Sequence, residues 1–399
     1  MTYRKNTMPR FGQPLDKGDA ELLGRDAADR AARALSLRSD KATPLHALPG
    51  LAAELGIGAL YLKDEGHRLG LGSFKALGGA YALMVLVQRE AARKLGRPVG
   101  IEELLSDEIR EIAAAMTFAC ATDGNHGRSV AQGAQMMGAR AVIFVHSGVS
   151  EARIAAIEAF GAEIVSVSGN YDDSVAEAAR VARAEGWTIL SDTSWPGYEE
   201  IPGLVMQGYT AMVKEILTAL PHPPTHVFLQ AGVGGFAAAV AGHLALEFGA
   251  DRPHVTIVEP ARAACIFDSA RTGKPVTVAG QPPTVMAMLE CYAPSLVALR
   301  ILERVADGFM LIDEESAPAI MRRLSDPAEG DPPVVAGESG GAGLAGLLAA
   351  LDDASVAAAI GLDAGSRVLA INTEGATDPA LYTRIVGQSP EAVLERARP

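Results

Sequence analysis

A lysine, Lys75, lies in a short loop rich in glycine and serine, residues 70–79, which joins a strand-like run to a helix-like one. The strand-like run covers residues 60–64 and the helix-like run covers residues 80–86. A strand, a glycine-rich turn and a helix in succession form the unit from which α/β folds are built. The N–H dipoles of a helix start favour a neutral amine, the form that makes a Schiff base with an aldehyde. Taken alone, Lys75 is more simply interpreted as a solvated surface residue; the other motifs reverse that interpretation.

Apolar runs and alanine-rich helical patterns alternate along most of the chain. Apolar runs without polar alternation are typical of parallel strands covered by helices on both faces. We therefore expect an α/β fold with open, mostly parallel sheets flanked by helices. The strand-like runs are residues 141–145, 163–167, 226–229, 255–258 and 368–371, and the helical patterns are residues 153–160, 175–184 and 343–350. A charged stretch, residues 100–113, predicts an exposed helix inserted between these elements.

The net charge of −13 argues against nucleic acid or an anionic membrane as the main partner. The polar N-terminus has no apolar segment of the kind that a signal peptide needs. The longest apolar stretch, residues 227–246, is interrupted by glycines and His243, which argues against a membrane span. We therefore expect a cytoplasmic protein.

Three cysteines, Cys120, Cys265 and Cys291, form neither a disulfide framework nor a zinc site by their spacing. Cys265 and Cys291 flank one segment that contains proline and glycine, so they could meet in space. Cytosolic thiols usually stay reduced, and the sequence leaves their pairing open.

A second motif, Cys-Ala-Thr-Asp-Gly-Asn-His-Gly at residues 120–127, precedes a helical pattern. Its glycines permit a tight turn, and the amides of a helix start bind anions such as a substrate carboxylate. Asn125 offers an amide that could hydrogen-bond a ring oxygen, and Asp123 is a candidate base. The alternative is an Asp/Asn turn with a helix cap. His126 is predicted to be structural.

A third motif, Ala-Gly-Val-Gly-Gly at residues 231–235, joins a strand-like run to a helical pattern. This geometry binds a phosphate through backbone amides. The motif matches neither the ATP P-loop nor the dinucleotide fingerprint.

Two further motifs lie near the C-terminus. Thr373 follows a strand-like run and would place a hydroxyl at a strand end, where ligands of open α/β sheets bind. Glu338 lies in another glycine-rich turn, residues 337–341, where its alternative role is to cap a helix.

In this order (S-F-K, G-N-H-G, G-V-G-G, N-T-E-G) the motifs identify a family. From about residue 43 to residue 378 the chain resembles the pyridoxal-phosphate enzymes of the tryptophan-synthase-β type (fold type II), which include serine and threonine dehydratases. Within that group it is most similar to the diaminopropionate ammonia-lyases. The segments that carry this similarity are residues 63–65, 73–75, 121–127, 192–195 and 197–202. Most dehydratases have a serine where Asp123 stands here.

The resemblance implies pyridoxal 5′-phosphate as the cofactor, with Lys75 forming the internal aldimine. It implies that Asn125 contacts the 3′-oxygen and that Thr373 contacts the pyridine nitrogen. A hydroxyl at that nitrogen leaves the ring largely unprotonated, which favours elimination over transamination. The other cofactor-binding residues that it implies are Gly232, Val233, Gly234 and Gly235 at the phosphate and Glu338 beside the ring. The substrate-binding residues are Ser73, Thr122, Asp123, Gly124, Tyr171 and Asp192, with packing as the alternative role for Tyr171; no metal is expected.

The activity expected from the resemblance is α,β-elimination of 2,3-diaminopropionate to pyruvate and two ammonia. Lys75 and Asp123 would act as bases on opposite faces, which would allow both D and L substrates. The alternative is a serine, threonine or hydroxyaspartate dehydratase, although Asp123 would repel a β-carboxylate. An inactive cofactor-binding protein and a nucleotide-binding module are the alternatives outside this class.

We expect a large cofactor-binding domain of residues 1–110 and 200–399 and a small mobile domain of residues 111–199. The cofactor would lie in the cleft between them, where closure would exclude water. The resemblance implies a homodimer that binds a small amino-acid substrate and neither nucleic acid nor membrane.

Overall fold

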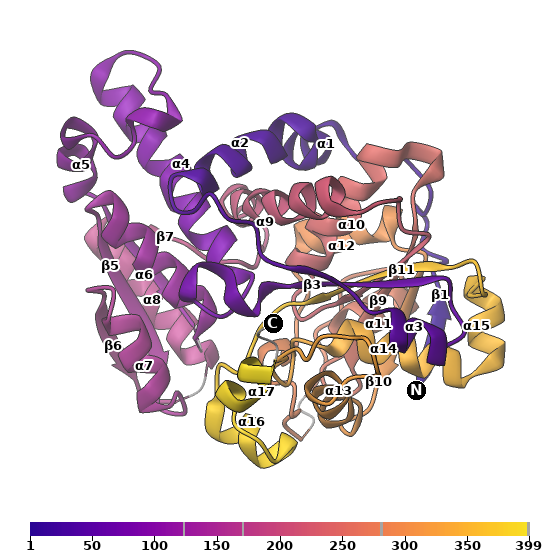
Figure 1. Ribbon diagram of the computed structural model, residues 1–399. Helices are drawn as coiled ribbons and strands as arrows, with labels where there is room; N and C mark the ends of the chain where they lie inside the picture. Colours follow the sequence, from indigo (N-terminus) through magenta and orange to yellow (C-terminus); the bar gives the residue numbers. More distant parts are fainter. Residues whose placement is uncertain (123, 170, 280–281, 397–399) are drawn as a thin grey trace. The chain divides into compact units, whose positions relative to one another are not determined.

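The computed structural model describes residues 1–122, 124–169, 171–279 and 282–396. The chain divides into two compact units (Figure 1). Unit 1 consists of Met1–Arg25, Lys41–Phe74 and Met212–Pro399, and unit 2 of Asp26–Asp40 and Lys75–Ala211. Each unit is built on its own sheet.

Unit 1 contains a mixed sheet, the large sheet, with strand order β1-β10-β9-β8-β11-β3-β2. The neighbours from β10 to β3 run parallel, and the edge strands β1 and β2 are antiparallel to theirs. The inner strand β8 is buried along its whole length, as its unbroken apolar run predicts. The strands are β1 (Thr2–Lys5), β2 (Leu45–Ala47), β3 (Ala59–Asp64), β8 (His226–Gln230), β9 (His254–Pro260), β10 (Gly308–Ile312) and β11 (Arg367–Asn372).

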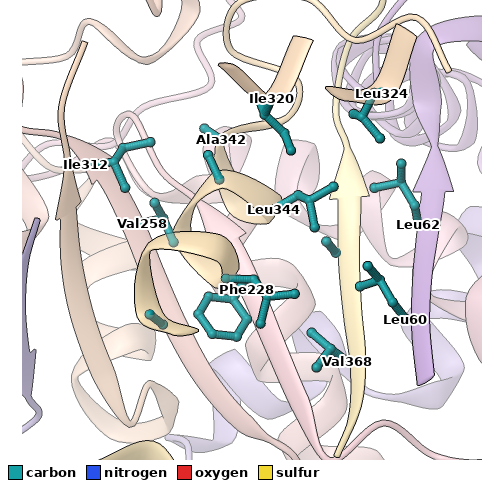
Figure 2. Close-up of a cluster of buried hydrophobic side chains, with 14 of the residues drawn as sticks. Leu60, Leu62, Phe228, Val258, Ile312, Ile320, Leu324, Ala342, Leu344 and Val368 are labelled. Atoms are coloured by element: carbon teal, nitrogen blue, oxygen red, sulfur yellow. The ribbon is translucent and has the colours of Figure 1, made fainter. Parts of the chain in front are cut away.

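Helices surround this sheet, and α14 packs against the inner strands. Figure 2 shows Leu344 of this helix among Phe228, Val258 and Val368 of the strands. Burial of apolar side chains such as these is the dominant favourable term in folding. The helices of unit 1 are α1 (Lys17–Leu23), α3 (Pro49–Glu54), α10 (Gly235–Phe248), α11 (Cys265–Thr272), α12 (Leu296–Val305), α13 (Ser316–Ser325), α14 (Ala342–Asp352), α15 (Ala354–Ile360), α16 (Pro379–Val386) and α17 (Pro390–Arg396).

Unit 2 contains a parallel sheet, the small sheet, with strand order β6-β5-β4-β7. Its strands are β4 (Thr117–Ala121), β5 (Arg140–His146), β6 (Glu163–Val167) and β7 (Thr188–Ile189). Helices α4 and α6 pack closely: a Cβ on Gly133 would lie 2.8 Å from the Cα of Ala80. The helices here are α2 (Arg25–Ser36), α4 (Lys75–Leu95), α5 (Asp107–Ala114), α6 (Asn125–Met137), α7 (Glu151–Glu158), α8 (Tyr171–Glu185) and α9 (Glu200–Ala219), whose residues divide between the units.

The predicted α/β class with mostly parallel sheets is confirmed. The charged stretch 100–113 is not one exposed helix: α5 covers only its second half, and Ile109 and Ala113 are buried. The predicted domains, residues 1–110 with 200–399 and residues 111–199, differ in their boundaries from the compact units. Because compactness does not establish which segments move as a body, the small mobile domain stays a prediction.

In the described part of the chain, no single helix has the length and apolar character to cross a membrane. Only α14 and α15 taken together pass by length and composition, with a bend of 110° between them. Among the described residues, Cys120, Cys265 and Cys291 form no disulfide.

Candidate active site

The backbone that leads into Lys75 is tied to the end of β11. Ser73 forms a β-bridge with Glu374, and the amide of Phe74 donates to the carbonyl of Thr373 at 2.9 Å. The ring of Phe74 lies 4.7 Å from that of Phe236 between centroids. These contacts, all within unit 1, fix the residue that precedes Lys75.

Lys75 is the first residue of α4 and forms an ion pair with Asp192 in unit 2. The side chains are 23% and 16% exposed, so the pair is only partly hydrated. Nδ1 of the buried His126 lies 3.9 Å from the Asp192 carboxylate. The structure thus brings together two predicted site residues, Lys75 and Asp192, with a histidine predicted to be structural.

The charges in this cluster depend on one another. Burial by itself raises the pKa of the Asp192 carboxyl, but its interactions, those with Lys75 foremost, outweigh burial, so the net pKa lies below its usual range. Burial lowers the pKa of His126, and Asp192 offsets only part of that effect. His126 Nε2 lies 2.9 Å from the carbonyl of Leu190, which can only accept. We therefore assign the hydrogen to Nε2, which leaves Nδ1 as an acceptor without a partner among the described residues.

An aromatic pair holds the loop that carries Asp192. The hydroxyl of Tyr198 accepts from the amide of Ser191 at 3.1 Å and donates to the carbonyl of Ile189 at 2.8 Å. The rings of Tyr198 and Trp195 stack with centroids 4.2 Å apart. Both bonds of Tyr198 fix the backbone next to Asp192.

The turn before α6 is organised by a threonine. Thr122 Oγ1 accepts from the amides of Gly124 and Gly127, at 3.1 and 3.2 Å. Asn125 is buried as the first residue of α6. Asp123, the predicted second base, lies outside the described residues. Tyr171 begins α8 and is half-buried, so its predicted contact with substrate stays a prediction.

The glycine-rich turn of unit 1 lies between a strand and a helix, as predicted, and its binding of a phosphate stays a prediction. It links β8 to α10, and Gly234 has a φ of 96°, in the region that favours glycine. A Cβ on Gly232 would lie 2.9 Å from Cys291 Sγ. The first amides of a helix have no intrahelical acceptor, so those that begin at Gly235 can bind an anion.

Polar side chains accompany this turn in unit 1. Thr373 is buried, and its hydroxyl accepts from Nε2 of Gln230 at 2.9 Å. Glu338 is buried in the segment before α14. Ser73 Oγ is buried and has no partner among the described residues. Sequence analysis missed Gln230, whose signal was a lone amide at the end of an apolar strand.

These groups fit pyridoxal phosphate. In unit 2, Lys75 offers an amine. Within unit 1, the turn at residues 231–235 offers amides to a phosphate, and the hydroxyls of Ser73 and Thr373 are buried with hydrogen-bonding capacity to spare. Buried polar groups normally have partners, so such unused capacity indicates a ligand.

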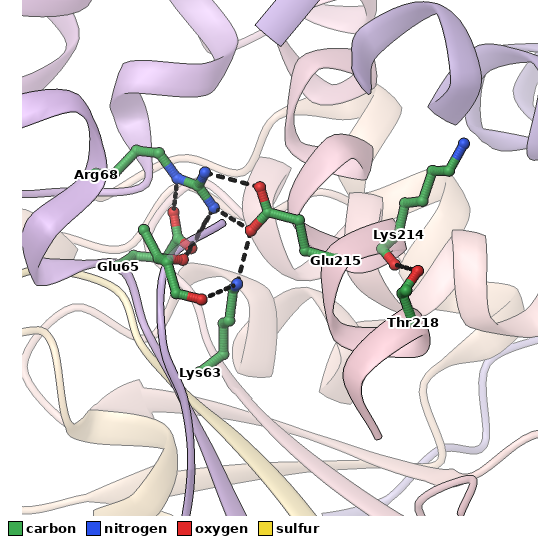
Figure 3. Close-up of polar contacts among 7 residues, drawn as sticks. Lys63, Glu65, Arg68, Lys214, Glu215 and Thr218 are labelled. Atoms are coloured by element: carbon green, nitrogen blue, oxygen red, sulfur yellow. Dashed lines mark hydrogen bonds and ion pairs between the residues drawn. The ribbon is translucent and has the colours of Figure 1, made fainter. Parts of the chain in front are cut away.

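A buried ionic network lies at the end of β3 and in the segment that follows it. Arg68 donates to the carboxylates of Glu65 and Glu215, and Lys63 donates to Glu215 at 2.6 Å (Figure 3). Thr43 closes the network through its hydroxyl and its carbonyl. Burial lowers the pKa of Arg68, but the two carboxylates reverse this and raise it above its usual range. Two cations thus offset two anions beside β3.

Comparison with known proteins identifies relatives over most of the chain. The model of a family described as "Pyridoxal-phosphate dependent enzyme" matches residues 37–374. The diaminopropionate ammonia-lyase of Salmonella typhimurium is 39% identical over 357 residues, which cover 86% of this chain and 87% of that protein. The diaminopropionate ammonia-lyase of Escherichia coli K12 is 39% identical over 359 residues, which cover 88% of each.

Solved structures agree with this relationship. The holo diaminopropionate ammonia lyase from Escherichia coli has a TM-score of 0.86 and 36% identity, with 96% of both chains covered. Its complex with an aminoacrylate-PLP azomethine reaction intermediate gives the same values. Threonine deaminase from Solanum lycopersicum, at 20% identity and a TM-score of 0.72, shares the fold.

Proposed function

We propose that this chain, which belongs to the pyridoxal-phosphate-dependent enzyme family, is an ammonia-lyase. Its proposed substrate is 2,3-diaminopropionate. One molecule of substrate and one of water would give pyruvate and two of ammonia. Identity of 39% over most of the chain to named diaminopropionate ammonia-lyases supports this substrate. The observation in the site that carries the proposal is the carboxylate of Asp192 beside Lys75.

Bound pyridoxal phosphate supplies an electron sink that stabilises negative charge at the substrate Cα. Lys75 would hold the cofactor covalently through Nζ and then move the proton at Cα. We propose Asp123 as the base for the opposite face of the substrate, so that both enantiomers react. Asp192 would bind the β-ammonium of the substrate, a cation that would take the place of the Lys75 ammonium with which this carboxylate pairs in the structure.

The remaining site residues have binding roles in this proposal. The turn of Gly232, Val233, Gly234 and Gly235 would hold the cofactor phosphate. Asn125 would face the ring oxygen, Thr373 the ring nitrogen, and Glu338 the ring edge. Ser73, Thr122, Gly124 and Tyr171 would contact the substrate. Of these, Ser73 has the strongest support, because its buried hydroxyl has no partner among the described residues.

We also propose a cytoplasmic homodimer without a nucleic-acid or membrane partner. The acidic net charge of −13 supports the absence of nucleic acid, and family resemblance supports the dimer. Light scattering on the cofactor-loaded protein tests the dimer: a mass near twice that of the chain supports it, and a monomeric mass contradicts it.

The activity is tested by pyruvate formation with purified, cofactor-loaded protein. We expect D- or L-2,3-diaminopropionate to turn over faster than L-serine, L-threonine and 3-hydroxyaspartate, with two ammonia released per pyruvate. Preference for a hydroxy amino acid, with one ammonia per oxo acid, would instead identify a dehydratase. The Lys75→Ala variant is the control for background, because it lacks the amine that holds the cofactor.

A further inference from the structure

Gln230 is the last residue of β8 and directly precedes the glycine-rich turn. It is 2% exposed. Its Nε2 lies 2.6 Å from the carbonyl oxygen of Gly340 and 3.0 Å from that of Ile371. The same nitrogen lies 2.9 Å from Thr373 Oγ1. One buried amide thus connects β8, β11 and the turn before α14.

The orientation of this amide follows from its neighbours. Carbonyl oxygens only accept, so the nitrogen of Gln230 must face Gly340 and Ile371; a flipped amide would set its own oxygen against both. An amide nitrogen donates and does not accept. The two hydrogens of this nitrogen are shared among three acceptors, and the hydroxyl of Thr373 can only be one of these acceptors, so its own hydrogen points elsewhere.

That hydroxyl hydrogen has no acceptor among the residues that the structure describes. A buried hydroxyl without an acceptor costs free energy, so a ligand that presents a lone pair to Thr373 would be stabilised. A ligand that presents an N–H would meet the hydrogen of the hydroxyl. The polarity of this contact is thus set by Gln230, which would touch no ligand atom in fixing it.

We propose that Gln230 is a positioning residue that holds Thr373 as a hydrogen-bond donor and so keeps the ring nitrogen of pyridoxal phosphate unprotonated. This inference rests on the proposed function, in which Thr373 faces that nitrogen. An unprotonated ring is a weaker electron sink for the electron pair left at Cα. That pair is then used to expel the β-substituent, so elimination is favoured over transamination. Gln230 would thereby direct the reaction towards elimination.

The test uses cofactor labelled with ¹⁵N in the ring, whose chemical shift reports protonation without any substrate. Wild-type protein should show the shift of an unprotonated pyridine. Gln230→Glu places an acceptor beside Thr373, which turns the hydroxyl around and should move the shift towards that of pyridinium. Thr373→Asp, which sets a carboxylate at the nitrogen, supplies the pyridinium reference.

Two further variants protect the test against misfolding. Gln230→Met removes the amide but keeps a side chain of similar volume. In this variant the ring nitrogen should gain its proton at a higher pH than in the wild type. Gln88→Met is the matched control, because Gln88 also donates to a backbone carbonyl, that of Val99 at 2.7 Å. It should keep the wild-type shift. Circular dichroism of each loaded variant establishes folding.

The inference would be overturned if the ring nitrogen of the wild type had the chemical shift of a pyridinium. It would also be overturned if the ring nitrogen in both folded Gln230 variants had the wild-type chemical shift and gained its proton at the wild-type pH. The outcome is independent of the activity assay. Elimination of diaminopropionate with a protonated ring would leave the function standing and remove the role of Gln230. A ring nitrogen that is unprotonated in a protein without this elimination activity would support the role of Gln230 and contradict the proposed function.

Discussion

Asp192 neutralises Lys75 in a partly buried ion pair, and Nδ1 of His126 lies 3.9 Å from the same carboxylate. The chain thus sets one full negative charge beside the lysine that is proposed to hold the cofactor. The β-ammonium of a substrate could replace Lys75 as the cation that pairs with Asp192, whereas a β-hydroxyl, which carries no charge, could not. In the proposed function, the specificity of the site would therefore centre on Asp192.

Asp192→Asn should lower kcat/KM for diaminopropionate by about 10- to 100-fold, the loss expected for a hydrogen bond to a charged group. Its kcat/KM for β-chloroalanine, whose β-substituent carries no charge, should fall much less. If the substitution also disturbs Lys75, that disturbance affects both substrates. The ratio of the two kcat/KM values therefore reports the contact with the β-ammonium alone. Asp326→Asn, at a carboxylate that is 86% exposed, is the control. An unchanged ratio would contradict the role given to Asp192.

Gly234→Ala should weaken the binding of pyridoxal phosphate. The φ of 96° strains any other residue by about 1–2 kcal/mol, and the new Cβ would lie 3.0 Å from Ile266. Gly273→Ala has a similar strain, with a φ of 73°, but open space around its Cβ. Cofactor titration followed by fluorescence compares the two. Equal affinities in both variants would show that the turn at Gly234 does not hold the phosphate.

Glu259→Gln should abolish one part of the pH dependence of stability. Burial raises the pKa of the Glu259 carboxyl to about 8, although it accepts from the amides of Ile266 and Phe267. Between pH 4.5 and 8 the unfolded chain is ionised here while the folded chain keeps its proton. The free energy of unfolding of the wild type should therefore fall as pH rises through this window, by up to about 1.4 kcal/mol per unit.

Urea unfolding between pH 5.5 and 8.5 measures this contribution as the difference between variant and wild type. The free energy of unfolding of the variant, relative to that of the wild type, should increase as the pH rises to about 8. Glu391→Gln, at an exposed carboxylate in α17, should show no such gain. A difference that does not vary with pH would mean that Glu259 is ionised in the folded protein.

Arg68→Met should destabilise unit 1 by about 3–5 kcal/mol, because it leaves Glu65 and Glu215 buried with only Lys63 to offset them. Arg93→Met, at a guanidinium that is 70% exposed and pairs with Glu90, should cost less than about 1 kcal/mol. Chemical denaturation gives both values. A small loss at Arg68 would show that the network contributes little to folding.

Much of the fold follows from local patterns. The strand predicted over residues 163–167 is β6 at those same residues, and the strand–turn–helix units around Lys75 and Gly234 lie where their glycines indicated. These features depend on periodicity and backbone conformation, which a sequence carries directly. The start of α4 was predicted less well: Lys75 was expected in a loop of residues 70–79 before a helical run at 80–86, whereas α4 begins at Lys75 and includes Gly78 and Gly79.

Pairings between distant residues were not predictable. Lys63 and Glu215 are 152 residues apart, and neither position differs in pattern from a solvated charge. Gln230 is separated from Thr373 by 143 residues and gains its role only because β8 and β11 are neighbours. Such contacts follow from strand order, which local periodicity does not determine.

Reduction of the cofactor-loaded protein with borohydride, followed by tryptic mapping, tests most directly whether Lys75 carries pyridoxal phosphate. Trypsin does not cleave at a modified lysine, so the phosphopyridoxyl group should appear on one peptide of residues 69–89. Fragmentation should then place it on Lys75. A label on another lysine, or none on a protein that nevertheless forms pyruvate from diaminopropionate, would contradict the assignment of Lys75.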